Sequence, residues 1–240
     1  MNAKIPKTPS LELLIELLAD YGDRTDETLD ERVERTTIDD ARYLIKLFTS
    51  LFRELLLKHN FDSRAITRLT TKFRDAGRRS PPWQSGSETG NRRPQDGKDG
   101  NRQNRWLFDK NHKFYASEQV ATLTEIRYIL QTLSMDNAPK MPDNKLMFSF
   151  TSILGHPFEP GRFLDPIQLV PIDFLKFIEN ARYLESGHIL PLGRGGKHTP
   201  DNATLMLKDS NRIQADLTRN ELLDLMANIL RRHGYQVIHS

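Results

Sequence analysis

The feature of this 240-residue sequence that most constrains its fold is an abrupt change of composition between about Ala76 and Asn104. Glycine, proline, serine, asparagine, glutamine and aspartate dominate this segment, and Trp83 is almost its only large apolar residue. Such a segment cannot bury enough apolar surface to offset the entropy that it would lose on ordering. We therefore expect residues 76–105 to form a flexible basic linker or long loop between two folded parts of the chain.

Basic residues outnumber acidic ones in this segment and just beyond it. The basic residues are Arg78, Arg79, Arg92, Arg93, Lys98, Arg102 and Arg105, against Glu88, Asp96 and Asp99. Two interpretations follow from this balance. The segment is either a solvated tether or a basic arm that contacts DNA phosphates and becomes ordered on binding.

The part before this segment, residues 1–75, is predicted to be a helical N-terminal unit. Ser10 and Thr37 are good N-cap residues, and each precedes a run whose apolar residues recur at helical spacing. Asp62 or Ser63 is expected to cap a third, more basic helix. The apolar stripes of these helices favour a structural role, as core or as a dimer face.

The part after the segment, residues 106–240, is predicted to be a C-terminal domain. Residues 117–133 have helical periodicity, and residues 146–150 are a candidate strand. Thr218-x-x-Glu221 is a capping-box signature before a leucine-rich final helix, which we expect to pack against the rest of the protein. Together, the helices and short strands predict an α+β fold.

Composition excludes several classes of protein and of site. The chain contains no cysteine, so disulfides, thiolate nucleophiles and thiolate zinc sites are excluded. A bound metal must then be held by oxygen or nitrogen donors, which favours hard ions such as Mg²⁺. No apolar run approaches the roughly 18 residues of a membrane span, and the N-terminus lacks the pattern of a secretory signal. We therefore expect a cytoplasmic protein with no membrane partner.

The segment from Glu185 to Arg212 carries the residues best suited to chemistry. It is predicted to form a short strand containing His188, a loop loosened by three glycines, a second strand over residues 203–207, and then a helix with Asn211 in its first turn. The loop would let the strands form a hairpin, with His188 facing Asn211. An imidazole that can deprotonate water, an amide oxygen that can bind Mg²⁺ and nearby cations together suit a phosphodiester site.

This segment resembles the HNH, or ββα-metal, nuclease motif over about residues 183–218. The matching elements, in order, are His188-Ile189-x-Pro191, Gly195-Gly196, Asn202 and Asn211. Their separations agree with the family pattern. The resemblance implies a ββα-metal nuclease motif flanked by helices in the C-terminal domain.

The resemblance also implies roles for individual residues. His188 would be the general base that activates the attacking water, and Asn202 would orient His188 by bonding to its backbone or ring. Asn211 would be a metal ligand provided by the helix. The residues expected to contact DNA phosphates are Arg194, Lys197, His198 and Arg212.

The sequence departs from the family pattern at Gly187. Many family members have a metal-binding aspartate at this position, immediately before the histidine. Glu185 lies two residues earlier, on the same face of a strand, and we hypothesise that it supplies the missing carboxylate. The alternatives are Asp201, Asp216, or a site that depends more on water and on substrate phosphate. The expected cofactor is Mg²⁺, with Mn²⁺ able to substitute.

The function implied by the resemblance is metal-dependent endonucleolytic cleavage of double-stranded DNA. The large regions outside the motif favour sequence recognition, as in a type II restriction enzyme. Such an enzyme would be a homodimer and would have a cognate DNA methyltransferase as its functional partner. The alternatives are a homing or phage-type nicking nuclease, or a non-catalytic DNA-binding protein on a degenerate HNH scaffold.

Overall fold

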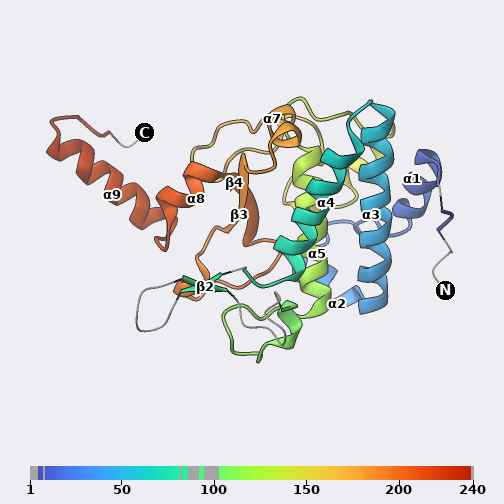
Figure 1. The fold of residues 1–240 in the computed structure, drawn as a ribbon, viewed down its shortest axis with the longest axis horizontal. Coiled ribbons are helices and arrows are strands. Elements are labelled where there is room, and N and C mark those ends of the chain that lie inside the picture. The colour runs from blue at the N-terminus through green and yellow to red at the C-terminus, as the bar shows by residue number, and fades with distance from the viewer. Residues whose placement is uncertain (1–4, 8, 82, 86–91, 95–102, 239–240) are drawn as a thin grey trace.

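A computed structural model describes residues 5–7, 9–81, 83–85, 92–94 and 103–238 of the chain. In these ranges the fold is mixed, with nine α-helices and two small antiparallel sheets. The α+β prediction is confirmed at this level. Helices α1 to α7 gather at one end of the molecule, and the second sheet, α8 and α9 lie toward the other end (Figure 1).

The first four helices are α1 (Leu11–Ala19), α2 (Leu29–Arg35), α3 (Ile38–Lys58) and α4 (Ser63–Arg78). Of these, α1, α3 and α4 lie where helical periodicity and capping residues predict them, whereas α2 was not predicted. The side chains of Ser10 and Thr37 cap α1 and α3, as expected, and Asp62 caps α4. None of the helices in the described residues is both long and apolar enough to cross a bilayer.

The central helix is α5 (Glu118–Leu133), which packs against both α3 and α4. Two short helices follow it, α6 (Thr151–Leu154) and α7 (Phe174–Glu179). The predicted strand at residues 146–150 is wrong. This region begins as a 3₁₀ helix, Asn144–Phe148, because the Asp143 side chain accepts a hydrogen bond from the backbone N–H of Lys145 and starts a helical turn.

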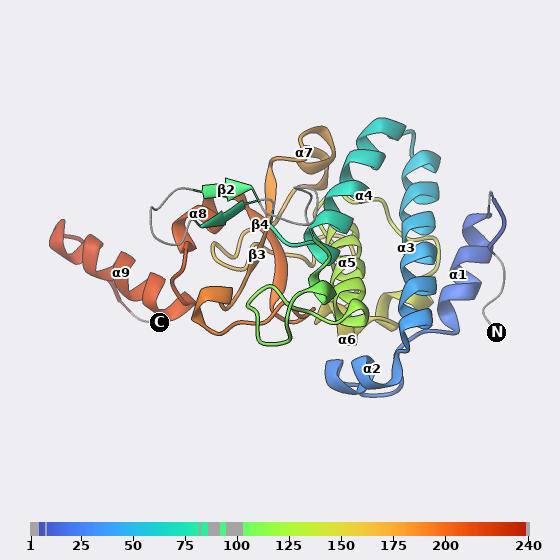
Figure 2. The same cartoon turned by 60° about the horizontal axis from the view of Figure 1, so that its bottom comes forward.

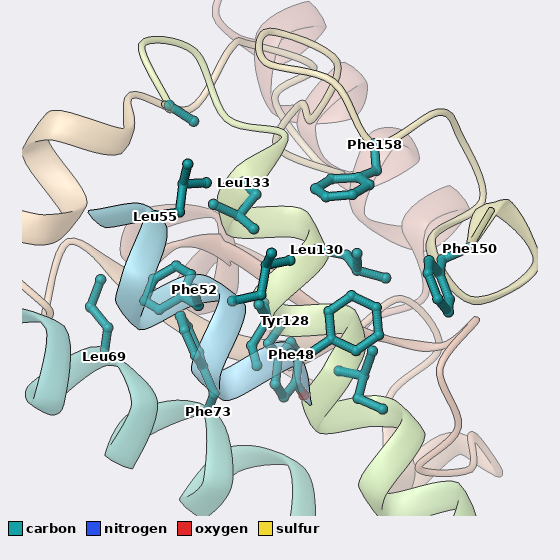
Figure 3. Close-up of a cluster of buried hydrophobic side chains, with 14 of the residues drawn as sticks. Phe48, Phe52, Leu55, Leu69, Phe73, Tyr128, Leu130, Leu133, Phe150 and Phe158 are labelled. Atoms are coloured by element: carbon teal, nitrogen blue, oxygen red, sulfur yellow. The ribbon is translucent and has the colours of Figure 1, made fainter. Parts of the chain in front are cut away.

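One hydrophobic core joins the helices on both sides of the polar segment (Figure 3). The rings of Phe48 on α3 and Phe150 meet edge to face with their centroids 4.8 Å apart. Phe73 on α4 lies close to Phe52 and to Phe177 on α7. The helices before the polar segment therefore share their core with the chain that follows it.

Much of the predicted linker or arm, residues 82, 86–91 and 95–102, lies outside the described residues. The described parts include a short antiparallel pair, β1 (Trp83–Ser85) with β2 (Arg92–Pro94). The backbone N–H of Ser80 donates to the carbonyl of Gln103 at 2.9 Å, and the backbones of Arg79 and Asn104 form an isolated antiparallel β-bridge. The segment thus leaves and rejoins the folded body at neighbouring points.

The second sheet is a hairpin of β3 (Leu184–His188) and β4 (Ala203–Leu207), followed directly by α8 (Lys208–Gln214). The strands run antiparallel, with His188 opposite Ala203 in the register. Helix α8 contacts both strands, and β4 packs against α5 (Figure 2). The hairpin and α8 therefore form a unit supported by the central helix.

Helix α9 (Arg219–Arg232) begins with the predicted capping box, because Thr218 and Glu221 bond reciprocally. The expectation that this helix packs is wrong for most of its length. Its buried residue is Leu222, and the helix extends away from the body (Figures 1 and 2).

Candidate functional site

The loop between β3 and β4 is held in shape by Asn202. Its Oδ1 accepts a hydrogen bond from the backbone N–H of Leu190 at 2.7 Å, and its Nδ2 donates to the carbonyls of Leu190 at 3.0 Å and Lys197 at 2.8 Å. The Asn202 carbonyl also accepts from the N–H of Ile189 at 2.9 Å. Asn202 therefore fixes the backbone that follows His188, and these bonds do not involve the imidazole ring.

A second amide, Gln214, supports His188 from α8. Its side-chain amide nitrogen, Nε2, donates to the carbonyls of His188 at 3.2 Å and Ile189 at 2.9 Å. Gln214 is buried, so these bonds form away from competing water. The end of β3 is thereby held between the Asn202 loop and α8.

The start of α8 is anchored by Asp165, a fully buried carboxylate. It accepts hydrogen bonds from the backbone N–H of Leu207 and from the Ser210 hydroxyl, both at 2.8 Å. It also accepts from the N–H groups of Ile167 and Gln168. These bonds compensate the burial of the charge and fix the helix that carries Asn211.

Glu185 and Asn211 come together across β3 and α8. The Asn211 Nδ2 donates to Glu185 Oε2 at 2.7 Å, and both residues are half-buried. Gly187 explains how Asn211 fits, because a Cβ there would lie 2.8 Å from Asn211 Oδ1 and 2.7 Å from Met206 Sδ. An aspartate at position 187 would therefore require these neighbours to move, whereas Glu185 reaches Asn211 without such a conflict.

The donors of this pair fit a hard metal ion. Among the described residues, no group of three or more histidine, aspartate or glutamate side chains could hold a metal. Glu185 and Asn211 instead offer a carboxylate and an amide oxygen. Mg²⁺ is often bound through one or two protein oxygens, with water and phosphate completing its coordination. The pair is therefore suited to Mg²⁺ rather than to a fully protein-ligated metal.

The two alternative carboxylates lie in other surroundings. Asp216 lies against the loop, where a Cβ on Gly193 would be 2.8 Å from its Oδ1. Asp201 is exposed, and its charge acts on Arg127. The carboxylate that the structure brings to Asn211 is that of Glu185.

His188 is joined to a second histidine inside the protein. Its Nε2 lies 2.9 Å from Nδ1 of His198, and Nε2 of His198 lies 2.7 Å from the carbonyl oxygen of Gly77 at the end of α4. A carbonyl only accepts, so Nε2 of His198 must carry a proton, and a neutral His198 then accepts at Nδ1. His188 must donate from Nε2, which leaves the lone pair of its Nδ1 available as a base.

Both histidines are held neutral by their surroundings. Burial, together with the positive charge of Arg105, lowers the pKa of His188 to about 3. Burial, Arg105 and His188 lower the pKa of His198 well below its ordinary value of 6.5. His198 is only 1% exposed, so an internal role as the partner of His188 replaces the expected contact with DNA phosphate.

The other predicted phosphate-binding residues lie at the surface. Lys197 and Arg212 are exposed, whereas Arg194 forms an ion pair with Glu221 at the start of α9. The side chains of Lys197 and Arg212 are therefore accessible to a phosphate. The Arg194 guanidinium is already shared with a carboxylate.

Several residues at the site were not found from the motif. Burial lowers the pKa of the Lys72 ammonium group on α4, and the negative charge of Glu185 acts in the opposite direction. Arg105 lies near the histidine pair, and Gly77 provides the carbonyl that His198 requires. Lys72 and Arg105 stand out in the sequence only as members of basic segments. Lys72 comes to the site with α4, which packs against α5, and Arg105 comes with the 3₁₀ turn Arg105–Leu107, which also packs against α5 and whose Arg105 donates to the carbonyl of Ala76.

Comparisons with known proteins assign no family to the chain. No known protein family and no curated protein matches it. A solved structure of a type II restriction endonuclease is similar, with a TM-score of 0.43 and 16% sequence identity. The similarity covers 51% of this chain and 55% of that one, so the chain spans about half the length of that structure. A likeness this low carries no conclusion about fold or function.

Proposed function

We propose that this protein is a metal-dependent DNA endonuclease whose site is formed by β3, the following loop and α8. The observation that carries the proposal is the hydrogen bond between Asn211 and Glu185. Asn211 lies against Gly187, which immediately precedes His188 in β3. This arrangement combines oxygen donors for a metal with a neutral imidazole. The same hairpin and helix carry the residues that resemble the HNH motif.

His188 acts as the general base in this proposal. Its Nδ1 accepts a proton from the attacking water, and its Nε2–H remains bonded to His198. The pKa of His188 is low in the free protein because the imidazolium would be buried near Arg105. A phosphodiester bound nearby would bring negative charge and so favour the protonated form. Substrate binding would therefore make His188 a stronger base.

Glu185 and Asn211 would hold Mg²⁺, with Mn²⁺ able to substitute. When bound, the ion supplies positive charge to the reacting phosphate and the leaving oxygen. Lys197 and Arg212 are exposed and would contact flanking phosphates. Asn202 and Gln214 would keep the His188 backbone in position.

The more specific proposal is a type II restriction enzyme that cuts double-stranded DNA at a defined sequence. The helices outside the hairpin and the basic segment after α4 would supply the recognition surface. A homodimer would cut both strands of a palindromic site, and a cognate methyltransferase would protect the host DNA.

The test is digestion of mixed-sequence DNA by the purified protein with Mg²⁺ or with EDTA. The comparison is His188→Ala, with His59→Ala as a matched control because His59 is exposed at the end of α3. We expect discrete fragments only with Mg²⁺ and an intact His188. A smear would indicate a nuclease without sequence specificity.

Two further outcomes separate the alternatives. Binding of DNA without cleavage would contradict the enzyme proposal and support a non-catalytic DNA-binding protein, for which the missing aspartate at Gly187 is the motivating observation. A supercoiled plasmid distinguishes the two nuclease types. Linear product indicates cleavage of both strands, whereas accumulation of open circles indicates a nicking nuclease.

A further inference from the structure

Helix α9 presents a broad apolar face to solvent. We call its exposed members the α9 stripe: Leu223, Leu225, Met226, Ile229 and Leu230, each 41–48% exposed. At about 100° per residue these side chains fall on one side of the helix. Figures 1 and 2 both show the helix extending away from the helical body.

The α9 stripe is not needed for the core of its own chain. Leu222, at the start of the helix, is buried, whereas the stripe residues that follow are exposed. A single helix of 14 residues is only marginally stable in water without packing. Large contiguous apolar patches are typical of sites of protein association. The stripe therefore has the properties of a helix face that lacks its partner.

The charges beside the stripe identify the kind of partner. Glu221 and Arg232 lie on the same edge of the stripe, about three helical turns apart. The midpoint between them falls between Met226 and Ala227. A two-fold axis at this midpoint would place each Glu221 opposite the Arg232 of a second, antiparallel α9. The helix is thus complementary in charge to a copy of itself.

The start of α9 is already oriented for such a contact. Glu221 accepts hydrogen bonds from the backbone N–H of Thr218 and from Arg194, which hold its carboxylate in place. A carboxylate has about four lone-pair sites, so it can accept a further donor. A stable dimer commonly buries roughly 800 Å² per partner. Two further large apolar side chains, Tyr235 and Ile238, are exposed just after the helix.

We propose that the α9 stripe is a homodimer interface in which α9 pairs antiparallel with α9 of a second copy. This interface does not require the proposed nuclease activity. It would nevertheless affect that activity, because α9 follows α8, which carries Asn211. The two candidate sites would then be related by the same two-fold axis.

Cysteine cross-linking tests the pairing directly, because the chain has no cysteine of its own. Met226→Cys places a thiol near the proposed axis, and His233→Cys places one at the C-terminal end of the helix. An α-helix rises 1.5 Å per residue, so the two thiols of the second variant would be roughly 20 Å apart in the antiparallel pair. We expect mild oxidation to link Met226→Cys into dimers and to leave His233→Cys unlinked.

The association itself is measured by sedimentation at micromolar concentration. The unmodified chain should be a dimer, and the double variant Met226→Glu/Ile229→Glu should be a monomer. Both side chains are exposed and lie outside the core, so the monomer should still melt cooperatively, with any loss of helical circular dichroism limited to about the 14 residues of α9. A monomeric unmodified chain would overturn the proposal, as would equal cross-linking of the two cysteine variants. These outcomes do not depend on whether the protein cleaves DNA.

Discussion

Replacing His198 by glutamine changes how the stability of the protein depends on pH. His198 is buried and neutral in the folded protein, with a pKa well below 6.5. In the unfolded chain its pKa returns to about 6.5. As the pH falls below 6.5, His198 is protonated in the unfolded chain but stays neutral in the folded protein. Acidification therefore favours unfolding through this residue.

The magnitude follows from the ordinary histidine pKa of about 6.5 in the unfolded chain, because the folded protein keeps His198 neutral. One histidine with these properties lowers the free energy of unfolding by about 1.4 kcal/mol per pH unit below 6.5, or about 2 kcal/mol at pH 5. Glutamine does not titrate, so His198→Gln lacks this contribution. At pH 7.5 the variant should be less stable by about 1–3 kcal/mol, because Nδ1 of His198 no longer accepts from His188.

The assay is urea unfolding of both proteins at several pH values between 5 and 7.5. Relative to His198→Gln, the unmodified protein should lose about 2 kcal/mol in the free energy of unfolding between pH 7.5 and pH 5. Comparing the two proteins removes contributions from other groups, such as Glu125, whose pKa is raised to about 7 by burial. A difference that stays constant over this range would refute the inference that His198 is buried in its neutral form.

Three other substitutions test the support of the site. Gly187→Ala should destabilise the protein by about 1–3 kcal/mol in urea unfolding, because the new methyl would press on Met206 and Asn211; unchanged stability would contradict this close packing. Asp165→Asn should lower the free energy of unfolding by about 1–3 kcal/mol, since the NH₂ group of the new asparagine would face the N–H of Leu207, a second donor. Unchanged stability of this variant would mean that Asp165 does not anchor α8. Gln214→Ala should lower the rate of DNA cleavage more than DNA affinity, because it frees the carbonyls of His188 and Ile189; an equal effect on DNA binding would place Gln214 in the binding surface instead.

Local signals in the sequence were sufficient for the longer helices α1, α3, α4, α5 and α9 and for the hairpin with α8, but not for the short helices α2 and α6. Ser10, Thr37 and Thr218 begin helices because their side chains accept bonds from the first turn, a property read from neighbouring residues alone. The strand at residues 146–150 was wrong because a short apolar run does not distinguish a strand from buried helical turns. The Asp143 side chain starts a helical turn here, and the buried residues Leu146 and Phe150 are four positions apart, as on one face of a helix.

The surroundings of the site could not be read from the motif, because they depend on packing between distant segments. His198 has the appearance of a loop residue in the sequence. It is buried because the end of α4 places the carbonyl of Gly77 beside it. The exposure of the α9 stripe could not be predicted either. Apolar periodicity shows which face of a helix needs a partner, but it does not show whether the same chain provides that partner.

The most direct test of the proposed site is the single-turnover rate of DNA cleavage at increasing Mg²⁺ concentration. Glu185→Ala and Asn211→Ala are compared with Asp209→Ala, which removes an exposed carboxylate from the same helix as Asn211. The first two variants should cleave slowly and require more Mg²⁺, while Asp209→Ala should behave like the unmodified protein. Full Mg²⁺-dependent cleavage by Glu185→Ala or Asn211→Ala would contradict the assignment of the metal to this pair.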